Sequence, residues 1–184
     1  DSHKYTRGHL TIFGGAEMTG AARLAAMAAR RAGAGLVTIT AQGSAATYRA
    51  GDPGVIVSAA PLADLLTDRR RAAWLCGPGL GETAGACLAT LLAAGRTVVA
   101  DADALTACAG APEKLAGAAV LTPHDGEFAR VFGPAGPDRL AAARAAAART
   151  GAGGGLKGAA TVSAAPDGRT AINDNAPPWL ATAV

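Results

Sequence analysis

The run LTPHDGEF, at Leu121–Phe128, places an imidazole and two carboxylates directly after a short apolar segment. Pro123 cannot donate to a strand ladder, so we expect the strand to end there and His124 to project from its end as a hydrogen-bond donor or acceptor. Glu127 falls in the first turn of a predicted helix, where it could cap that turn or help to organise a metal shell. The pattern favours contact between His124 and a ligand over a purely structural histidine.

Two carboxylates stand two residues apart in DADAL, at Asp101–Leu105, again after an apolar segment. Mg²⁺ is commonly held by one or two carboxylates together with phosphate oxygens, so the pair could hold this ion, with Asp101 as the better ligand. The pair could equally cap the next helix, and Asp103 is the better cap. The sequence does not choose between these two interpretations.

A lysine precedes a glycine in LKGAAT, at Leu156–Thr161. The ammonium of Lys157 is a compact point charge close to hydroxyl groups, which suits a phosphate. A surface lysine in a turn would give the same pattern. Both interpretations remain open on these residues alone.

Two glycine-rich runs also follow apolar segments. FGGAEMTGAA, at Phe13–Ala22, lets the backbone approach a ligand, and the helix that follows offers unpaired N–H groups to an anion. GPGLG, at Gly77–Gly81, has the same two uses, although either run could simply be a tight turn with close helix packing. Neither run contains GxGxxG, so the dinucleotide-binding fingerprint is not supported.

Short β-rich segments alternate with longer helical ones along the chain. Strands are predicted at His9–Phe13, Leu36–Thr40, Val55–Ser58, Trp74–Cys76, Thr97–Ala100 and Ala119–Leu121. Helices are predicted at Gly20–Ala32 with Thr19 as N-cap, at Glu82–Ala94 and at Pro137–Thr150, and a Pro-Asp-Gly turn joins a hairpin of Thr161–Ala165 and Arg169–Ile172. The alternation predicts an α/β fold with a mostly parallel sheet, in which ligands bind beyond the carboxyl ends of the strands. DADAL, TPHDGEF and the two glycine-rich runs all lie at such ends.

The chain has 184 residues, which predicts one domain over residues 1–184. Its net charge is +3, but the arginines are scattered, and the clusters at Arg30–Arg31 and Arg69–Arg71 are short. Proteins that bind nucleic acids usually carry denser basic patches. These arginines are therefore predicted to be solvated helix surface, and no nucleic-acid partner is expected.

The three cysteines, Cys76, Cys87 and Cys108, show no CxxC spacing and are predicted to be small buried residues of a reducing compartment. No apolar run approaches the roughly 18 residues of a membrane-spanning helix, so no membrane contact is expected. No signal peptide opens the chain. These features together predict a cytoplasmic protein.

Taken in order, these segments resemble the ADP-dependent NAD(P)H-hydrate dehydratases, a ribokinase-like family. The matching runs are HK at His3–Lys4, GG…TGAA at Gly14–Ala22, RAGAGLVT at Arg31–Thr38, GPGLG, DADAL, TPHDGEF, LKGAAT and LATA at Leu180–Ala183. The resemblance spans nearly the whole chain. It implies an α/β/α sandwich around a large, mostly parallel central sheet.

The resemblance also implies a reaction for this chain. The family repairs NADH or NADPH whose nicotinamide ring has been hydrated, the compounds NADHX and NADPHX. ADP phosphorylates the ring hydroxyl and phosphate then leaves, so that AMP and phosphate are the by-products, and Mg²⁺ assists. Members tend to form homo-oligomers, commonly tetramers, and are often fused to or paired with an NAD(P)H-hydrate epimerase.

Positions that match the family's motifs acquire implied roles. The resemblance implies that the hydrate pocket is lined by Ala21, Ala22, Gly79 and His124. It implies that the adenine nucleotide is held by Lys157, Gly158, Ala159, Ala160 and Thr161, with Lys157 on the phosphates. Asp101 and Glu127 remain the candidate Mg²⁺ ligands.

The chain departs from the family at three places. In the family LATA continues into Gly-Thr/Ser-Gly-Asp, whose Asp is the base on the substrate hydroxyl. This sequence stops at Val184, so no catalytic base is assigned and the C-terminal part of the domain is expected to be missing. Asp125 stands where the family usually has proline. Gly153–Gly155 stand where a β-branched strand is expected, and each interior glycine costs roughly 0.5–1 kcal/mol relative to alanine, which argues against a strand there.

Two other functions remain open. One is a different ribokinase-like small-molecule kinase, such as a vitamin-precursor kinase, which would use ATP and another acceptor. The other is a non-catalytic nucleotide-binding remnant, which would retain the binding groups without the base.

Overall fold

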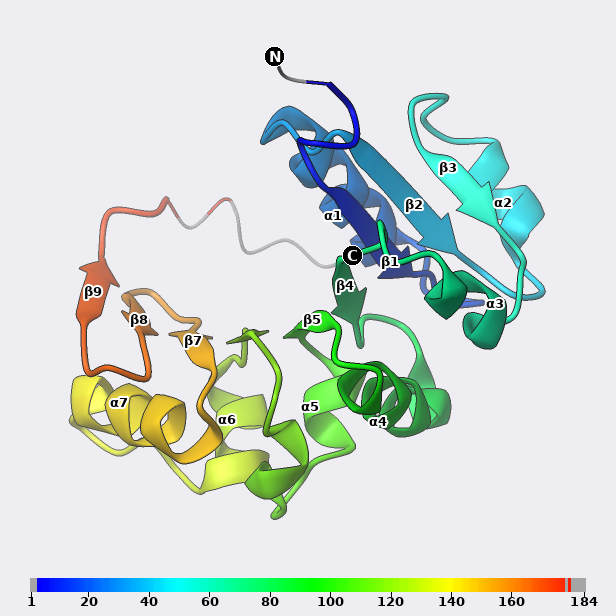
Figure 1. The fold of residues 1–184 in the computed structure, drawn as a ribbon. Helices are drawn as coiled ribbons and strands as arrows, with labels where there is room; N and C mark the ends of the chain where they lie inside the picture. Colours follow the sequence, from blue (N-terminus) through cyan, green and yellow to red (C-terminus); the bar gives the residue numbers. More distant parts are fainter. Residues whose placement is uncertain (1–2, 178, 180–184) are drawn as a thin grey trace.

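The computed structural model describes residues 3–177 and residue 179, and within them nine strands form one sheet in the order β3-β2-β1-β4-β5-β6-β7-β8-β9 (Figure 1). Strands β1 to β7 run parallel, whereas β8 pairs antiparallel with β7, and β9 pairs antiparallel with β8. The strands are β1 (His9–Phe13), β2 (Leu36–Thr40), β3 (Ile56–Ser58), β4 (Ala73–Cys76), β5 (Thr97–Ala100), β6 (Val120–Leu121), β7 (Gly153–Leu156), β8 (Thr161–Ala164) and β9 (Thr170–Asn173). The predicted α/β class with a mostly parallel sheet is confirmed.

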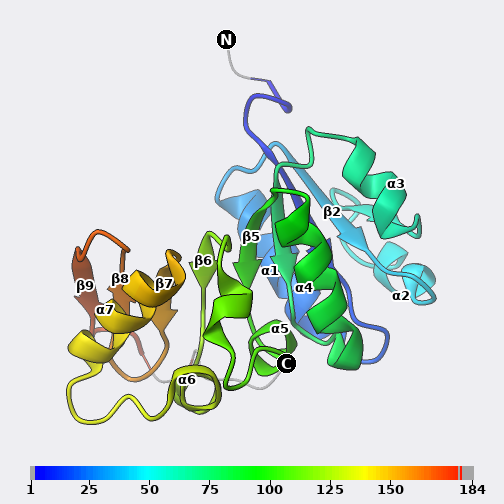
Figure 2. The ribbon, with the colours of Figure 1, turned by 60° about the horizontal axis from the view of Figure 1, so that its bottom comes forward.

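Helices cover both faces of the sheet (Figure 2). Helices α1 and α2 pack on one face, over β1 to β3, and α3 to α7 pack on the other. The helices are α1 (Gly20–Arg31), α2 (Ala45–Arg49), α3 (Leu62–Thr67), α4 (Ala84–Ala93), α5 (Asp103–Thr106), α6 (Asp125–Phe132) and α7 (Arg139–Thr150), with 3₁₀ turns η1 (Gly81–Thr83) and η2 (Pro112–Leu115). Sequence analysis does not predict α2 or α3, because elements of five or six residues show too little periodicity.

The sheet separates the core into layers that hold the strand ends in place. Ile12 of β1 is buried in a cluster that also contains Ala22 of α1 and Tyr48 of α2. On the opposite face Trp74 is fully buried, with its ring centroid 5.7 Å from that of Phe13. Phe128 of α6 belongs to a further cluster, which it forms with residues of α7, β7 and β8. Because β1 and β4 are packed on both faces, the loops that leave their carboxyl ends start from fixed positions.

The glycine run Gly153–Gly155 forms strand β7, which corrects the expectation that no strand would form there. Gly153 pairs in parallel with Val120 of β6, and Gly155 pairs in antiparallel with Ser163 of β8. The strand therefore has a ladder on each side, and the hydrogen bonds of both ladders offset the entropic cost of ordering glycine.

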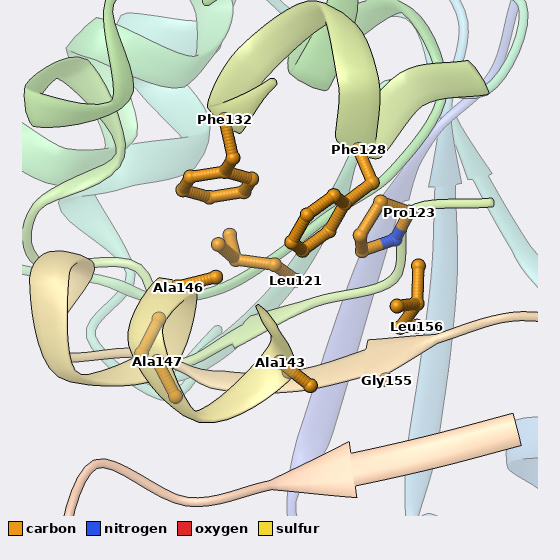
Figure 3. Close-up of a pocket in the computed structure, with 11 residues that line it drawn as sticks. Leu121, Pro123, Phe128, Phe132, Ala143, Ala146, Ala147, Gly155 and Leu156 are labelled. Atoms are coloured by element: carbon orange, nitrogen blue, oxygen red, sulfur yellow. The ribbon is translucent and has the colours of Figure 1, made fainter. Parts of the chain in front are cut away.

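A small apolar cavity of about 20 Å³ lies between β6, β7, α6 and α7 (Figure 3). The phenyl rings of Phe128 and Phe132 lie on one side of it and the alanines of α7 on another. Gly154 lines it from β7, in register with Leu121. The cavity is large enough for a methyl group and too apolar to hold a water well.

Replacing Gly154 with alanine should raise the free energy of unfolding by about 0.5–1 kcal/mol, because alanine has fewer unfolded conformations than glycine. The nearest atom to the new Cβ would be the Leu121 carbonyl oxygen, at 3.9 Å, so the methyl group fits. Urea unfolding of the purified protein measures the change. As a control, Gly151→Ala should destabilise the protein, since Gly151 ends α7 with a φ of +71°. A loss of stability in Gly154→Ala would contradict this account.

Candidate functional site

Loops from several strands meet at the carboxyl edge of the sheet, as the alternation of strands and helices predicts. The closest link joins the loops after β6 and β7. His124 and Lys157 form an isolated parallel β-bridge, and the Lys157 N–H donates to the Pro123 carbonyl at 2.8 Å. This link confirms that the imidazole and the ammonium stand at one edge of the sheet.

A cavity of about 800 Å³ opens at the same edge, between the loops after β1 and β4. These strands are neighbours in the sheet, but the chain continues from β1 towards β2 and from β4 towards β5, so strand order reverses at the cavity. Open α/β sheets bind ligands at this point, and small-molecule sites commonly measure about 300–1,000 Å³. The lining residues are Phe13, Gly14, Gly15, Ala16, Glu17, Met18, Thr40, Gln42, Leu62, Gly79, Leu80, Gly81, Thr83, Cys87 and Asp103.

Glycines let the loops around this cavity touch through their backbones. A Cβ on Gly15 would lie 2.2 Å from the Gly79 carbonyl oxygen, and Gly79 itself has a φ of +72°. A Cβ on Gly77, whose φ is +134°, would lie 1.7 Å from the Asp101 carbonyl oxygen. The glycines are therefore required for close packing of the loops, and their contact with a ligand stays a prediction.

Two side chains hold the carbonyl of Gly15. Tyr48 Oη donates to this oxygen at 2.9 Å, and Ser44 Oγ donates to it at 3.3 Å. Burial raises the pKa of Tyr48, so its hydroxyl remains a donor at neutral pH. Neither residue was predicted from the sequence, because no motif contains them. Ser44 precedes the short helix α2, and Tyr48 lies within it.

Lys157 lies between two carboxylates. Its Nζ is 2.9 Å from Asp101 Oδ1 and 3.9 Å from Glu127 Oε2. The side chain of Lys157 is 43% exposed, whereas that of Glu127 is 7% exposed. The ammonium thus neutralises a largely buried carboxylate while part of it still faces solvent, where an anion can approach.

Glu127 and His124 form a reciprocal cap at the start of α6. Glu127 Oε2 accepts from the His124 N–H at 2.8 Å, and His124 Nδ1 accepts from the Gly126 N–H at 2.9 Å and from the Glu127 N–H at 3.3 Å. The sequence left two roles open for Glu127, capping of the helix and organisation of a metal shell. In the structure Glu127 caps α6. Because Nδ1 accepts, Nε2 is the ring's available donor; it lies 3.5 Å from Glu127 Oε1, and the ring is half-exposed, so a ligand could reach it.

Asp103 does not cap the next helix, which was one of the two interpretations left open for the aspartate pair. Asp103 is the first residue of α5, and its Oδ2 accepts from the Gly81 N–H at 2.8 Å, which ties the loop after β5 to the loop after β4. Between the two aspartates, Ala102 has a φ of +47°, a strained value for alanine. The turn directs Asp101 towards Lys157 and Asp103 towards the cavity.

The first turn of α1 begins two residues after Met18, which lines the cavity. Thr19 precedes this helix but makes no capping hydrogen bond with its side chain, so the predicted cap is absent. Ala22 is fully buried in the core and Ala21 is half-buried. The backbone N–H groups of residues 20–22 have no backbone acceptor in the described part of the chain. This turn therefore offers backbone donors, rather than the methyl group of Ala22, to an anion.

Comparison with known proteins identifies the family. The family model for NAD(P)H-hydrate dehydratase matches residues 10–183. The chain belongs to this family. The bifunctional NAD(P)H-hydrate repair enzyme of Mycobacterium tuberculosis is 41% identical to it over 187 residues, and that of Gloeobacter violaceus is 42% identical over 196 residues. Each alignment covers 98% of this chain and 38% of the relative, so the chain spans well under half the length of these relatives.

Solved structures confirm the ribokinase-like fold of this dehydratase family. A ribokinase-like superfamily protein of Enterococcus faecalis matches with a TM-score of 0.82 at 28% identity, covering 99% of this chain and 68% of that one. The ADP/ATP-dependent NAD(P)H-hydrate dehydratase of Bacillus subtilis, co-crystallised with ATP and Mg²⁺, matches with a TM-score of 0.78 at 28% identity, covering 99% and 69%. The sequence resemblance to the dehydratases is thus confirmed.

The structure places the positions that the dehydratase resemblance assigns as follows. Gly79 lines the large cavity, and His124 and Lys157 pair with each other at the same edge. Residues 158–160 connect β7 to β8, and Thr161 begins β8. LATA, at Leu180–Ala183, lies outside the described residues. The binding roles of these positions stay predictions.

Mg²⁺, which the dehydratase resemblance implies, has two candidate ligands. Asp101 Oδ1 pairs with Lys157, while Oδ2 makes no hydrogen bond within the described part of the chain. Glu127 is largely buried and caps α6. Residues 3–177 and 179 contain no group of three or more His, Cys, Asp or Glu side chains that could hold a metal ion. An ion that brings phosphate oxygens of its own needs only one protein carboxylate, and Asp101 fits that need better than Glu127.

The cysteines of this dehydratase-family chain are partly as predicted. Cys76 and Cys108 are buried, whereas Cys87 is half-buried and lines the large cavity. Burial raises the pKa of Cys76 to about 12, and it also raises the pKa of the Cys87 thiol, so both stay protonated at neutral pH. Among the described residues, no helix combines the length and the apolar character that crossing a membrane requires.

Proposed function

We propose that residues 1–184 form a single domain that binds ADP and hydrated NADH or NADPH, and that this domain belongs to an ADP-dependent NAD(P)H-hydrate dehydratase. The observation that carries the proposal is the pairing of His124 with Lys157 at the edge that also holds the cavity of about 800 Å³. This edge combines room for a dinucleotide with a cation for phosphate and an imidazole donor. Membership of the dehydratase family supports the choice of substrates.

In this proposal the cavity holds the hydrated dinucleotide. Gly79 contributes backbone surface, and the unpaired N–H groups of Ala21 and Ala22 face a phosphate of the dinucleotide. His124 donates a hydrogen bond from Nε2 to the substrate and keeps its proton. The four glycines among the residues that line the cavity leave space for the nicotinamide ring.

The segment Lys157–Thr161 would hold ADP. The ammonium of Lys157 binds the phosphates, and its contacts with Asp101 and Glu127 keep it at the edge of the sheet before the nucleotide arrives. Mg²⁺, when bound with the nucleotide, neutralises phosphate charge, and Asp101 is its proposed ligand.

The proposed reaction has two steps. The hydroxyl oxygen of the hydrated ring attacks the terminal phosphorus of ADP and gives up its proton to solvent, and the bond from that phosphorus to the bridging oxygen breaks, so that AMP leaves with this oxygen. The ring C–O bond then breaks, phosphate departs with the oxygen, the neighbouring ring carbon loses a proton to solvent, and the ring regains its double bond. The protein's part is positioning and charge neutralisation, which dominate phosphoryl transfer. We assign no residue between Asp1 and Val184 as the catalytic base.

The test is recovery of NADH absorbance from NADHX by protein expressed from the complete gene, with ADP and Mg²⁺. Stoichiometric release of AMP and phosphate is expected. Absence of recovery would refute the proposal. A preference for ATP with a different acceptor would indicate another ribokinase-like kinase, and binding of ADP without turnover would indicate a non-catalytic nucleotide-binding protein.

We further propose that the protein acts beside an NAD(P)H-hydrate epimerase, as a cytoplasmic homo-oligomer and specifically a homotetramer. The bifunctional names of the curated relatives support the link to an epimerase. Light scattering of the purified protein measures the number of subunits.

A further inference from the structure

Arg139, the first residue of α7, connects two parts of the site that are distant in sequence. Its side chain is 28% exposed. Nη1 donates to Asp125 Oδ1, and Nη2 donates to the Lys157 carbonyl at 3.1 Å and, more weakly, to the Leu156 carbonyl at 3.5 Å. A single guanidinium therefore joins the residue after His124 to the backbone of Lys157.

The peptide groups of Lys157 are held on both sides. Its N–H donates to the Pro123 carbonyl at 2.8 Å, and its carbonyl accepts from Arg139. These two bonds fix the backbone from which the side chain extends towards Asp101. Strand β7 ends at Leu156, so sheet pairing supports Lys157 only through its isolated bridge to His124, and its carbonyl is held by Arg139.

Gly158 lies directly against the guanidinium of Arg139. A Cβ on Gly158 would lie 2.7 Å from Arg139 Nη2. The φ of Gly158 is not in the left-handed region, so the backbone conformation by itself would accept alanine. A side chain at position 158 would therefore displace the end of the Arg139 guanidinium from its present position.

We propose that Arg139 is a positioning residue, which holds the nucleotide segment 157–161, and with it Lys157, in place beside His124. The inference rests on the proposed role of this segment in binding ADP. Arg139 acts through the backbone of Lys157 and not by touching the phosphates. Its planar fork of donors, rather than its charge alone, is what the role needs.

The first test is ADP binding by calorimetry, with protein expressed from the complete gene. Arg139→Gln should weaken binding about tenfold, because a hydrogen bond from a charged donor is lost. Arg139→Lys keeps the charge but not the fork, so it should restore little of the affinity. Arg144→Gln, an exposed arginine of the same helix that bonds Thr170, is the matched control and should bind ADP like the parent. Full rescue by lysine would overturn the inference, since it would indicate a simple charge effect.

The second test is a double-mutant cycle with Gly158. Gly158→Ala should weaken ADP binding in the parent protein, because the new methyl group displaces the guanidinium. In the Arg139→Gln background, Gly158→Ala should change the Kd for ADP by less than about twofold, because groups in contact are energetically coupled. Additive effects would overturn the inference.

Amide hydrogen exchange separates this inference from the proposed function. Exchange at residues 157–161 in the ligand-free protein should become faster in Arg139→Gln and stay unchanged in Arg144→Gln. A parent protein that binds no ADP would refute the nucleotide site and the positioning role together. A parent that binds ADP, with unchanged exchange and affinity in Arg139→Gln, would overturn the inference alone.

Discussion

Lys157→Met is expected to lower kcat/KM for ADP-dependent recovery of NADH by about 10²- to 10³-fold, the usual cost of removing one preorganised donor from a developing charge. Lys157 lies next to His124, and its Nζ contacts the carboxylates of Asp101 and Glu127. Without it, Asp101 and Glu127 would face the incoming phosphates unneutralised. Steady-state kinetics with ADP varied at saturating NADHX measure the effect. Most of the loss should appear as a higher KM for ADP.

A lysine elsewhere provides the control for this substitution. Lys114→Met changes the same side chain on the exposed surface of η2 and should leave the kinetics unchanged. Lys157→Met should also lower the free energy of unfolding by about 1–3 kcal/mol, because the largely buried Glu127 loses its nearby cation. A variant that is less stable but keeps kcat/KM within tenfold of the parent would refute the phosphate role of Lys157.

The sheet was largely predictable from the sequence, because its strands carry their own signal. Segments such as Leu36–Thr40 are short, β-branched and bounded by glycine, and the structure has them as strands. Strand β7 was not predictable in this way. Its glycines have no strand preference of their own, and the strand exists because β6 and β8 pair with it.

The site was predictable where strand topology alone decides it. Carboxyl ends of parallel strands share an edge, so His124 was expected there, whereas Lys157 was linked to the site only through the family resemblance, and the two residues pair. The contacts that hold the loops were not predictable. Arg139 occurs in a helix of alanine and arginine that resembles solvated surface, and Tyr48 occurs in no motif. Their partners are backbone carbonyls, which a sequence does not distinguish from any others.

Asp103 illustrates the same limit at shorter range. The sequence places it at the start of a helix, where an aspartate usually caps its own first turn. Its carboxylate instead accepts from the Gly81 N–H, 22 residues away in the chain. The preceding residue, Ala102, has a φ of +47°, and no local sequence pattern predicts a positive φ at an alanine.

Gly15→Ala is expected to raise the KM for NADHX at least tenfold and to lower the free energy of unfolding by about 1–3 kcal/mol, the usual cost of overpacking. The new Cβ would lie 2.2 Å from the Gly79 carbonyl oxygen and 2.8 Å from its carbon. Both are backbone atoms, so the loops after β1 and β4 must separate. The bonds from Tyr48 and Ser44 to the Gly15 carbonyl would be strained by the same movement.

The two substrates should respond differently to Gly15→Ala. The cavity between these loops is the proposed site of the hydrate, whereas Lys157 lies at the end of β7, three strands from β4 in the sheet order. The KM for ADP should therefore change less than threefold, a ratio that general loss of folded protein would not produce. Gly155→Ala is the matched control, since its Cβ would meet nothing within 4 Å, and both of its KM values should equal those of the parent. Equal changes of both KM values in Gly15→Ala would show that the two sites are not separate, because a defect confined to the cavity cannot weaken ADP binding as much as hydrate binding.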